Sequence, residues 1–315
     1  MLERNRAAVL IYGGDNTSRE AVIMRVGVIF PTISIGNDPG GIRDYIQTAE
    51  ALGFKHILVF DHVLGAGLTT RPNWRGPYNY TNGFHEPMVL FGFIAALTKR
   101  IEMATGVLIL PQRQTALVAK QAAEVDVLSS GRLRLGVGIG WNDVEYECLG
   151  EDFHKRGRRV EEQARLLREL WSNELVTFEG DFDRVIDAGI NPRPVRKNIP
   201  LWFGGNEDVA LRRIARVADG WFPLFGMGDK GAARIDRMRE YLREAGRGIT
   251  GYGPYFGMDP MLQGGDRGPQ EWAAEAEWWK GHEATHLSFN SMTSGRHGAK
   301  AHIEAIKKFA EVMDL

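Results

Sequence analysis

The 315-residue chain lacks the features that define several large classes of protein. Its single cysteine, Cys148, excludes an intrachain disulfide framework and favours a reducing compartment, so we expect a cytoplasmic protein. No apolar run is long enough to cross a bilayer. The formal net charge of -1 provides no attraction to nucleic acid or to an anionic membrane, and we expect neither as a partner.

Familiar catalytic motifs are also missing from the sequence. There is no G-x-S-x-G elbow and no Walker phosphate loop. No group of His, Cys, Asp and Glu has the spacing of zinc ligands, so no metal site is expected. Glycine, by contrast, is abundant, with 38 residues, and several of them fall at the ends of apolar runs.

From Met24 onward, short apolar runs alternate with longer amphipathic segments. Strands or extended segments are expected at 25–30, 56–60, 101–110, 132–138, 200–205, 218–225, 251–258 and 284–290. Helices are expected at 40–52, 86–98, 115–129, 155–172, 207–217, 229–245, 269–281 and 299–313. This alternation predicts an α/β fold, a (β/α)8 TIM barrel with insertions, although an open doubly wound sheet has a similar pattern. Residues 1–23 are expected to be a disordered N-terminal extension, and 24–315 a single domain.

Two insertions interrupt the alternation. The segment from Gly65 to His85 is rich in glycine, proline and aromatic residues, and 177–198 has the pattern of a small hairpin. Insertions in barrels usually form loops on the catalytic rim, so both are candidates for binding substrate. In the first insertion, Trp74, Tyr78 and Tyr80 are expected to close over an apolar or aromatic compound.

The stretch "RLRLGVGIGWNDVEYECLG" has the order strand, glycine turn, helix. A dinucleotide fingerprint requires G-x-G-x-x-G in the first βα unit, whereas here Gly136, Gly138 and Gly140 are two apart and Trp141 takes the sixth position. Two interpretations remain. The glycines leave a bare strand face for a large flat ligand, or they allow close packing of helix and strand.

The stretch "VFDHV" places Asp61 and His62 at the carboxyl end of the second predicted strand. Active sites of parallel barrels gather at that end, and histidine titrates near neutral pH. Successive strand residues point to opposite faces, so one side chain should face the barrel mouth while the other orients it or caps the loop. Alternatively, the pair simply ends a strand.

Two further glycine positions follow the same logic. Gly106 interrupts the apolar strand "MATGVLIL", which indicates a bulge or a close approach of backbone. In "LWFGGNED", Asn206 is predicted to cap a helix whose free N–H groups could hold a phosphate. Glu207 and Asp208 would repel a phosphate, so a merely capped helix is the competing interpretation.

Together these stretches resemble the bacterial luciferase-like superfamily, in particular its branch of deazaflavin (F420)-dependent oxidoreductases. The resemblance covers nearly all of Met24 to Leu315, and its most specific part runs from Ala104 to Gly150. It implies an eight-stranded (β/α) barrel, often dimeric, with F420 or FMN edge-on in the barrel mouth. We therefore expect a homodimer with F420 as cofactor and FMN as the alternative.

The resemblance also implies roles for individual residues. Those matching catalytic or cofactor-binding positions are Asp61, His62, Gly106, Val107, Leu108, Gly138, Gly140, Trp141, Gly204, Gly205 and Asn206. Asp61 and His62 match a pair near the reactive cofactor edge, and a cis peptide between Gly106 and Val107 would back the central ring. Trp141 stands where some relatives have a glutamate proton donor, so either His62 or a loop residue would handle the proton, or the chemistry differs. Trp141 itself would stack on cofactor or substrate.

The implied function is hydride transfer between F420 and a small organic substrate that is apolar or aromatic. The first alternative is an FMN-dependent monooxygenase that uses O2 and receives reduced flavin from a separate reductase. The second is a non-catalytic protein that binds flavin or deazaflavin. The substrate itself and the direction of hydride transfer stay open at this stage.

Overall fold

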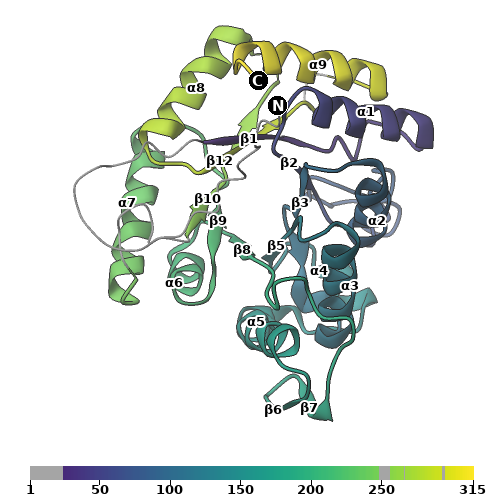
Figure 1. Cartoon of the computed structure of the whole chain (residues 1–315), viewed down its shortest axis with the longest axis vertical. Coiled ribbons are helices and arrows are strands. Elements are labelled where there is room, and N and C mark those ends of the chain that lie inside the picture. The colour runs from purple at the N-terminus through teal and green to yellow at the C-terminus, as the bar shows by residue number, and fades with distance from the viewer. Residues whose placement is uncertain (1–23, 248–255, 266, 293–294) are drawn as a thin grey trace, which may run out of the picture.

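The computed structural model describes residues 24–247, 256–265, 267–292 and 295–315. The predicted N-terminal extension and most of the segment predicted at 251–258 therefore lie outside the described residues. Figure 1 shows a curled sheet at the centre with helices around its outer side.

Most of the helices and strands agree with the predicted ranges to within a few residues, and β11 is an exception. The strands are β1 (Arg25–Ile29), β2 (His56–Val59), β3 (Glu102–Thr105), β4 (Leu108–Ile109), β5 (Leu133–Gly138), β6 (Val176–Glu179), β7 (Arg184–Ala188), β8 (Leu201–Gly204), β9 (Gly220–Phe222), β10 (Gly257–Met258), β11 (Met261–Gln263) and β12 (His286–Asn290). The helices are α1 (Pro39–Ala51), α2 (Pro87–Leu97), α3 (Thr115–Leu128), α4 (Asp143–Cys148), α5 (Arg156–Ser172), α6 (Asp208–Val217), α7 (Asp229–Glu244), α8 (Pro269–Gly281) and α9 (Ala299–Val312), with short 3₁₀ helices η1 (Leu110–Gln112) and η2 (Phe153–Lys155). Within this described part, no helix combines the length and the apolar character needed to cross a bilayer.

The main sheet has the order β10-β9-β8-β5-β3-β2-β1-β12-β11, with β4 paired to β5. The pairings along it are parallel. The strands at its two ends, β10 and β11, are separated in the chain by Asp259 and Pro260. A curled parallel sheet with helices on its outer side is an α/β architecture of the TIM-barrel type.

The second insertion forms the antiparallel hairpin of β6 and β7, which lies at the edge of the molecule beyond α5 (Figure 1). Glu162 of α5 accepts the backbone N–H groups of Asp181, Phe182 and Asp183, each at 2.8 Å. The hairpin therefore covers the outside of α5, and the prediction that it forms part of the catalytic rim is wrong. Rim loops follow strands, whereas this hairpin follows a helix.

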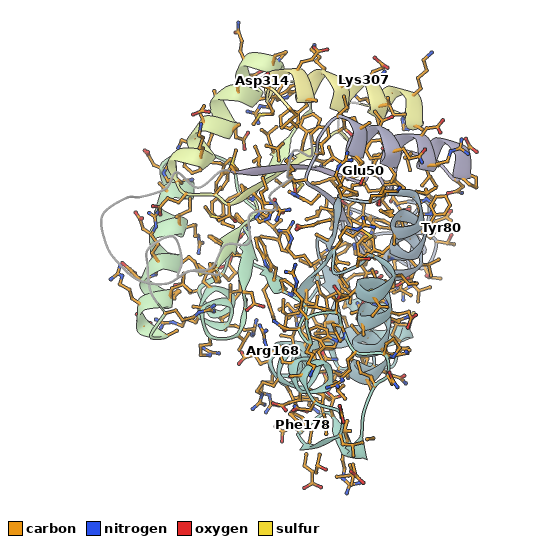
Figure 2. The ribbon with its side chains drawn as sticks, viewed as in Figure 1. Glu50, Tyr80, Arg168, Phe178, Lys307 and Asp314 are labelled. Atoms are coloured by element: carbon orange, nitrogen blue, oxygen red, sulfur yellow. The ribbon has the colours of Figure 1, made fainter. Side chains whose placement is uncertain are left out.

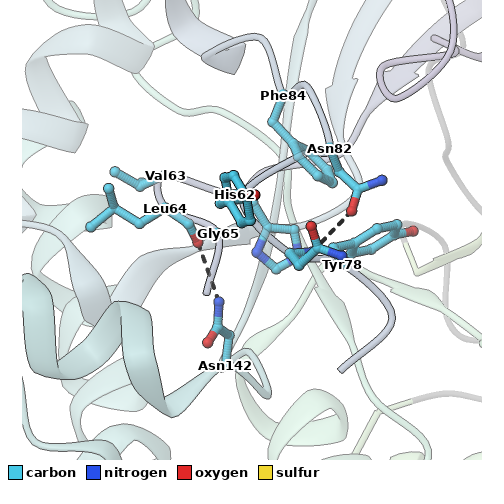
Figure 3. Close-up of a pocket in the computed structure, with 10 residues that line it drawn as sticks. His62, Val63, Leu64, Gly65, Tyr78, Asn82, Phe84 and Asn142 are labelled. Atoms are coloured by element: carbon cyan, nitrogen blue, oxygen red, sulfur yellow. Dashed lines mark hydrogen bonds between the residues drawn. The ribbon is translucent and has the colours of Figure 1, made fainter. Parts of the chain in front are cut away.

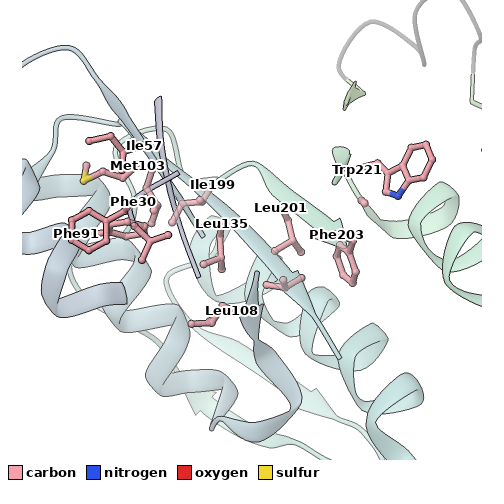
Figure 4. Packing of buried hydrophobic residues seen from close by; sticks show 14 of the residues in the cluster. Phe30, Ile57, Phe91, Met103, Leu108, Leu135, Ile199, Leu201, Phe203 and Trp221 are labelled. Carbon is pink, nitrogen blue, oxygen red and sulfur yellow. The ribbon is translucent and has the colours of Figure 1, made fainter. Parts of the chain in front are cut away.

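Strand residues alternate between two apolar layers, because successive side chains point to opposite faces. Phe30, Ile57 and Met103 pack with Phe91 of α2 between the sheet and the helices (Figure 4). A second cluster on the concave face contains Ile29, Leu58, Ala104, Trp202 and Phe222. Burial of each large apolar side chain contributes roughly 1.5–3 kcal/mol, so both layers together hold the curl of the sheet.

The amino ends of the strands carry a buried polar group on the concave face. Arg134 donates to Asp259 at 2.9 Å and stacks on Trp202, with its guanidinium carbon 4.3 Å from the ring centroid. Burial alone would raise the pKa of Asp259, but the neighbouring His56 and Arg134 lower it well below its ordinary value. Because this polar layer occupies the amino ends, a ligand on the concave face would have to enter from the carboxyl ends.

The connections at the amino ends are also fixed by hydrogen bonds. Glu50, labelled near α1 in Figure 2, accepts the backbone N–H groups of Lys99, Arg100 and Ile101 at 2.9, 2.6 and 3.0 Å. These three residues lead directly into β3. A single carboxylate thus ties the start of β3 to the end of α1, which leaves the opposite, carboxyl ends of the strands to carry a site.

Candidate functional site

The third predicted strand is divided into β3 and β4 by Gly106 and Val107, and the peptide bond between these two residues is cis. The resemblance implied this bond at this position. A Cβ atom added to Gly138 would lie 2.5 Å from Cγ2 of Val107, and one added to Gly204 would lie 3.1 Å from its Cγ1. The side chain of Val107 therefore occupies the space that glycines on β5 and β8 leave free.

The other glycines of the β5 segment also make room for neighbours. A Cβ atom on Gly136 would lie 1.9 Å from the carbonyl oxygen of Thr105, and one on Gly140 would lie 2.9 Å from Cγ2 of Ile109. Close packing, rather than a bare strand face, explains these glycines. The prediction is corrected in a second respect, because the packing joins neighbouring strands and not a helix and a strand.

Asp61 and His62 point in different directions, as strand alternation predicts. Asp61 is buried, accepts the backbone N–H of Ile109 at 3.0 Å and pairs with Arg113 at 2.8 Å. Burial raises its pKa above the ordinary value, and the guanidinium of Arg113 opposes that rise. The oxygens of Asp61 bond to Ile109 and Arg113, and the imidazole of His62 bonds to Glu145, so Asp61 is not the residue that orients His62. Asp61 instead joins the end of β2 to β4.

The hydrogen-bond partner of His62 is Glu145, which is not among the site residues predicted from the sequence. Nδ1 of His62 lies 3.0 Å from Oε2 of Glu145, and Oε1 accepts the backbone N–H groups of Val63 and Leu64 at 2.7 and 3.0 Å. The Glu145 side chain is fully buried. Burial alone would raise its pKa, but the hydrogen bonds from His62, Leu64 and Val63 lower it below the ordinary value.

A sequence signal for Glu145 did exist, although it indicated a different role. Asn142 followed three residues later by a glutamate is the pattern of a capping box. In the structure Asn142 makes no side-chain cap, and its amide donates to the carbonyl of Leu64 at 3.3 Å. Residues at the start of α4 therefore hold the loop after β2 and not their own helix.

Aromatic rings surround His62. The centroids of Phe84, Tyr78 and Trp141 lie 4.8, 5.3 and 5.4 Å from the imidazole centroid. Burial raises the pKa of the Tyr78 phenol. The structure thus places Trp141 and Tyr78 beside His62, and Tyr78 is one of the three aromatic residues expected to contact substrate.

A cavity of about 320 Å³ lies between the loop after β2 and the first insertion (Figure 3). His62, Leu64, Tyr78 and Phe84 line it, and Tyr80, 65% exposed, lies at its edge. The other lining residues are Val63, Gly65, Asn79, Asn82 and Asn142. Trp74 packs against Trp141 and lies outside this lining, as do Val107, Gly138 and Gly204.

Leu108 and Asn206 lie differently from their predicted arrangement. Leu108 is fully buried in the core between sheet and helices (Figure 4), so its side chain is not available to a ligand. Asn206 does not cap α6, because the N-cap is Glu207 and makes no side-chain bond. The Asn206 amide instead donates to and accepts from the backbone of Leu224, both at 3.1 Å.

The first turn of α6 is therefore uncapped, next to Gly205 in a left-handed conformation with φ +145°. Asp208 in this turn lies 3.7 Å from Arg234 and 3.8 Å from Arg237. Two arginines thus offset the charge of Asp208, while Glu207 at the N-cap is a second carboxylate beside this turn. In the described ranges, no group of three or more His, Cys, Asp or Glu side chains is arranged to hold a metal ion.

Comparisons with known proteins identify the family. Residues 23–313 match the luciferase-like monooxygenase family, and the chain belongs to it. The F420-dependent glucose-6-phosphate dehydrogenase of Amycolatopsis mediterranei (strain U-32) is 31% identical over 196 residues, which are 60% of this chain and 55% of that relative, about half its length. Membership in this family indicates an oxidoreductase.

Solved structures share the fold. Monooxygenase RslO1 from Streptomyces bottropensis superposes with a TM-score of 0.74 at 18% identity, covering 92% of this chain and 98% of that one. An F420-dependent secondary alcohol dehydrogenase, solved in complex with an F420–acetone adduct, gives 0.73 at 17% identity with the same coverage. At these identities the likeness concerns the architecture alone.

Proposed function

We propose that this chain is an F420-dependent oxidoreductase that transfers hydride to or from a small organic substrate, apolar or aromatic in character. The observation that carries the proposal is His62, which Glu145 anchors through Nδ1 while its ring lines a cavity with Tyr78 and Phe84. Relatives named as F420-dependent support the choice of cofactor. When bound, the deazaflavin would supply or accept the hydride.

The concave face suits a planar ring. Val107, Gly138 and Gly204 lie at the carboxyl ends of three neighbouring strands. Because two of these residues are glycines, Val107 contributes the only side chain of the three to this surface. A flat group could lie against that isopropyl surface without displacing anything larger. The uncapped turn of α6, with Arg234 and Arg237 beside it, could hold a phosphate of the same cofactor.

His62 is assigned the proton-handling role. Nε2 of its imidazole has no hydrogen-bond partner in the described part of the chain, and the ring lines the cavity. Tyr78 and Phe84 would exclude water from this nitrogen, and Trp141 beside it would stack on cofactor or substrate. A general acid–base group placed in this way typically contributes roughly 10²–10⁴-fold to the rate.

His62→Gln tests this role. We expect turnover to fall by about 10²–10⁴-fold while the affinity for F420 changes little. His282→Gln is the matched control, because His282 follows α8 and bonds to Trp278 at the amino-end side of the sheet. An unchanged turnover in His62→Gln would remove His62 from the mechanism.

The main alternative is an FMN-dependent monooxygenase with a separate flavin reductase, which the family description and the monooxygenase RslO1 favour. Titration of the purified protein with reduced F420 and with reduced FMN, followed by fluorescence, separates the two. Tight binding of F420 with substrate turnover supports the proposal. Tight binding of either cofactor without turnover, across a panel of alcohols, ketones and aromatic compounds, would favour a non-catalytic binding protein.

We further propose that the curled sheet closes into an eight-stranded barrel, with β10 and β11 as two parts of one strand. The backbone N–H of Thr285 donates to Met258 at 3.1 Å, and that of Ser288 donates to Pro260 at 3.0 Å, so the segment beside β12 is bonded on both sides of Asp259. Closure predicts slow hydrogen exchange at both amides. A single cooperative unfolding transition would support one domain over 24–315.

A homodimer is proposed through the outer surface of α2 and α3, which pack side by side. This surface exposes Val89 (75%), Phe93 (40%), Leu117 (52%) and Leu128 (60%). Exposed apolar groups on adjacent helices are typical of an interface between subunits. Light scattering of the wild-type chain and of a Val89→Asp/Phe93→Asp variant tests this, with a dimer and a monomer expected, respectively.

A further inference from the structure

We infer that Glu145 is a positioning residue that fixes the proton of His62 on Nδ1 and thereby presents Nε2, with its lone pair, to the cavity. The structural part of this inference depends on hydrogen bonds alone. Its consequence for catalysis rests on the proposed function.

The bonding around Glu145 determines where the proton lies. Oε1 is occupied by two backbone N–H donors, from Val63 and Leu64, at 2.7 and 3.0 Å. Oε2 lies 3.0 Å from Nδ1 of His62. An ionised carboxylate has no proton to donate, and hydrogen bonding lowers the pKa of Glu145, so Nδ1 must be the donor. In a neutral imidazole Nε2 is then the acceptor.

Glu145 also fixes the loop that carries His62. The two N–H groups that it accepts belong to the residues directly after His62, and the amide of Asn142 holds the carbonyl of Leu64 from the same end of α4. The side chain of Glu145 is fully buried, and that of His62 is 11% exposed. The side chain of Glu145 thus determines both the position of the His62 ring and the nitrogen that carries its proton.

Glu145→Gln reverses the tautomer without removing the contacts. The glutamine oxygen can still accept from Val63 and Leu64, which places the NH2 group opposite Nδ1 of His62. Nδ1 must then accept, so the proton of the neutral ring moves to Nε2. The opposite amide orientation would set NH2 against the two backbone N–H donors and lose both of those bonds, whereas the first orientation keeps all three contacts.

The surroundings tolerate this change. Nε2 of Gln112 lies 3.5 Å from Oε2 of Glu145, and Oε1 of Gln112 is buried with no hydrogen-bond partner among the described residues. Rotation of the Gln112 amide would offer that oxygen to the new NH2 group. The variant should therefore fold, with the volume of the side chain unchanged.

Nitrogen-15 NMR of the cofactor-free, full-length protein labelled at histidine tests the inference. Protonated and unprotonated imidazole nitrogens have well separated shifts, and the signals of His62 are assigned by their loss in His62→Gln. At about pH 8.5, well above the usual histidine pKa, we expect a protonated Nδ1 in the wild type and an unprotonated Nδ1 in Glu145→Gln. An unprotonated Nδ1 in the wild type, or a protonated one in the variant, would overturn the inference.

Turnover provides the second arm, and Glu147→Gln on the same helix is its control, since Glu147 is exposed. With reduced F420 and an accepted substrate, we expect Glu145→Gln to lower kcat by up to about 10²–10⁴-fold, the contribution of the proton-handling group, with little change in KM, and Glu147→Gln to change neither. The NMR result does not involve the cofactor. If the protein proves not to use F420, the tautomer assignment from NMR is unaffected. If Glu145→Gln shows the reversed tautomer by NMR but turns over like the wild type, the role of Glu145 in catalysis is refuted.

Discussion

His302 provides a quantitative test of the electrostatics of this fold. It is fully buried on α9, and its Nε2 and Nδ1 lie 2.9 Å from the hydroxyl groups of Ser34 and Ser291. Burial lowers its pKa from the ordinary value of 6.5 to about 4, with smaller contributions from Arg296 and His297. The folded protein therefore resists protonation of this ring, whereas the unfolded chain does not.

The sign and the size of the effect follow from this difference. As the pH falls below the unfolded pKa, the unfolded state binds a proton that the folded state refuses, so the free energy of unfolding decreases until the pH reaches the folded pKa. Each pKa unit corresponds to about 1.4 kcal/mol. Between about pH 7 and about pH 5, we expect His302 alone to remove about 2 kcal/mol of stability.

Urea unfolding followed by tryptophan fluorescence measures this loss. His302→Gln retains hydrogen-bonding groups but cannot titrate, so its stability should fall by about 2 kcal/mol less than that of the wild type over the same pH interval. Burial also lowers the pKa of His56 and of His286, which therefore contribute to the pH dependence of both proteins. The test is for this reason the difference in stability loss between the wild type and His302→Gln. Equal losses in both proteins would refute the reasoning.

Two substitutions near the site test other parts of the structure. Gly138→Ala places a Cβ atom 2.5 Å from Val107, so we expect the free energy of unfolding in urea to fall by about 1–3 kcal/mol and F420 to bind more weakly. Gly83→Ala is the control, because its Cβ atom would meet open space, and it should change stability by less than about 0.5 kcal/mol. Similar values for both variants would contradict the packing argument. Asp61→Asn keeps an acceptor for Ile109 but removes a buried charge beside Arg113, so we expect a loss of about 3 kcal/mol with the protonation of His62 unchanged. A shifted His62 tautomer in Asp61→Asn would show that the two residues act together after all.

Much of the fold could be predicted from the sequence because hydrophobic periodicity reports local structure. The alternation of apolar runs with amphipathic segments placed most helices and strands, and the interruption at Gly106 marked the division between β3 and β4. β11 was not predicted, since three residues beside Pro260 carry too little periodicity. The sequence pattern predicts the hairpin itself but not its position. The hairpin lies beside α5 because Glu162 accepts its backbone N–H groups, whereas helical periodicity alone predicts that a glutamate is exposed to solvent.

The site was predictable to the extent that it follows strand alternation. Asp61 and His62 were expected on opposite faces and lie so, but which acid bonds to the histidine could not be read from adjacency. Glu145 is distant in the sequence from His62, and its contacts depend on how α4 packs against the loop after β2. Asn206 was misassigned because a side chain that suits a helix cap also suits the backbone of a neighbouring loop.

The arrangement of Val107 between Gly138 and Gly204 has a consequence for how this sequence can change over evolutionary time. Three segments of chain share the volume of one small side chain, with distances of 2.5 and 3.1 Å to the Cβ atoms that either glycine would acquire. A methyl group gained on either strand would have to be matched by atoms lost at Val107. These three positions should therefore covary among homologues, so that the summed volume of their side chains is preserved while the individual residues exchange.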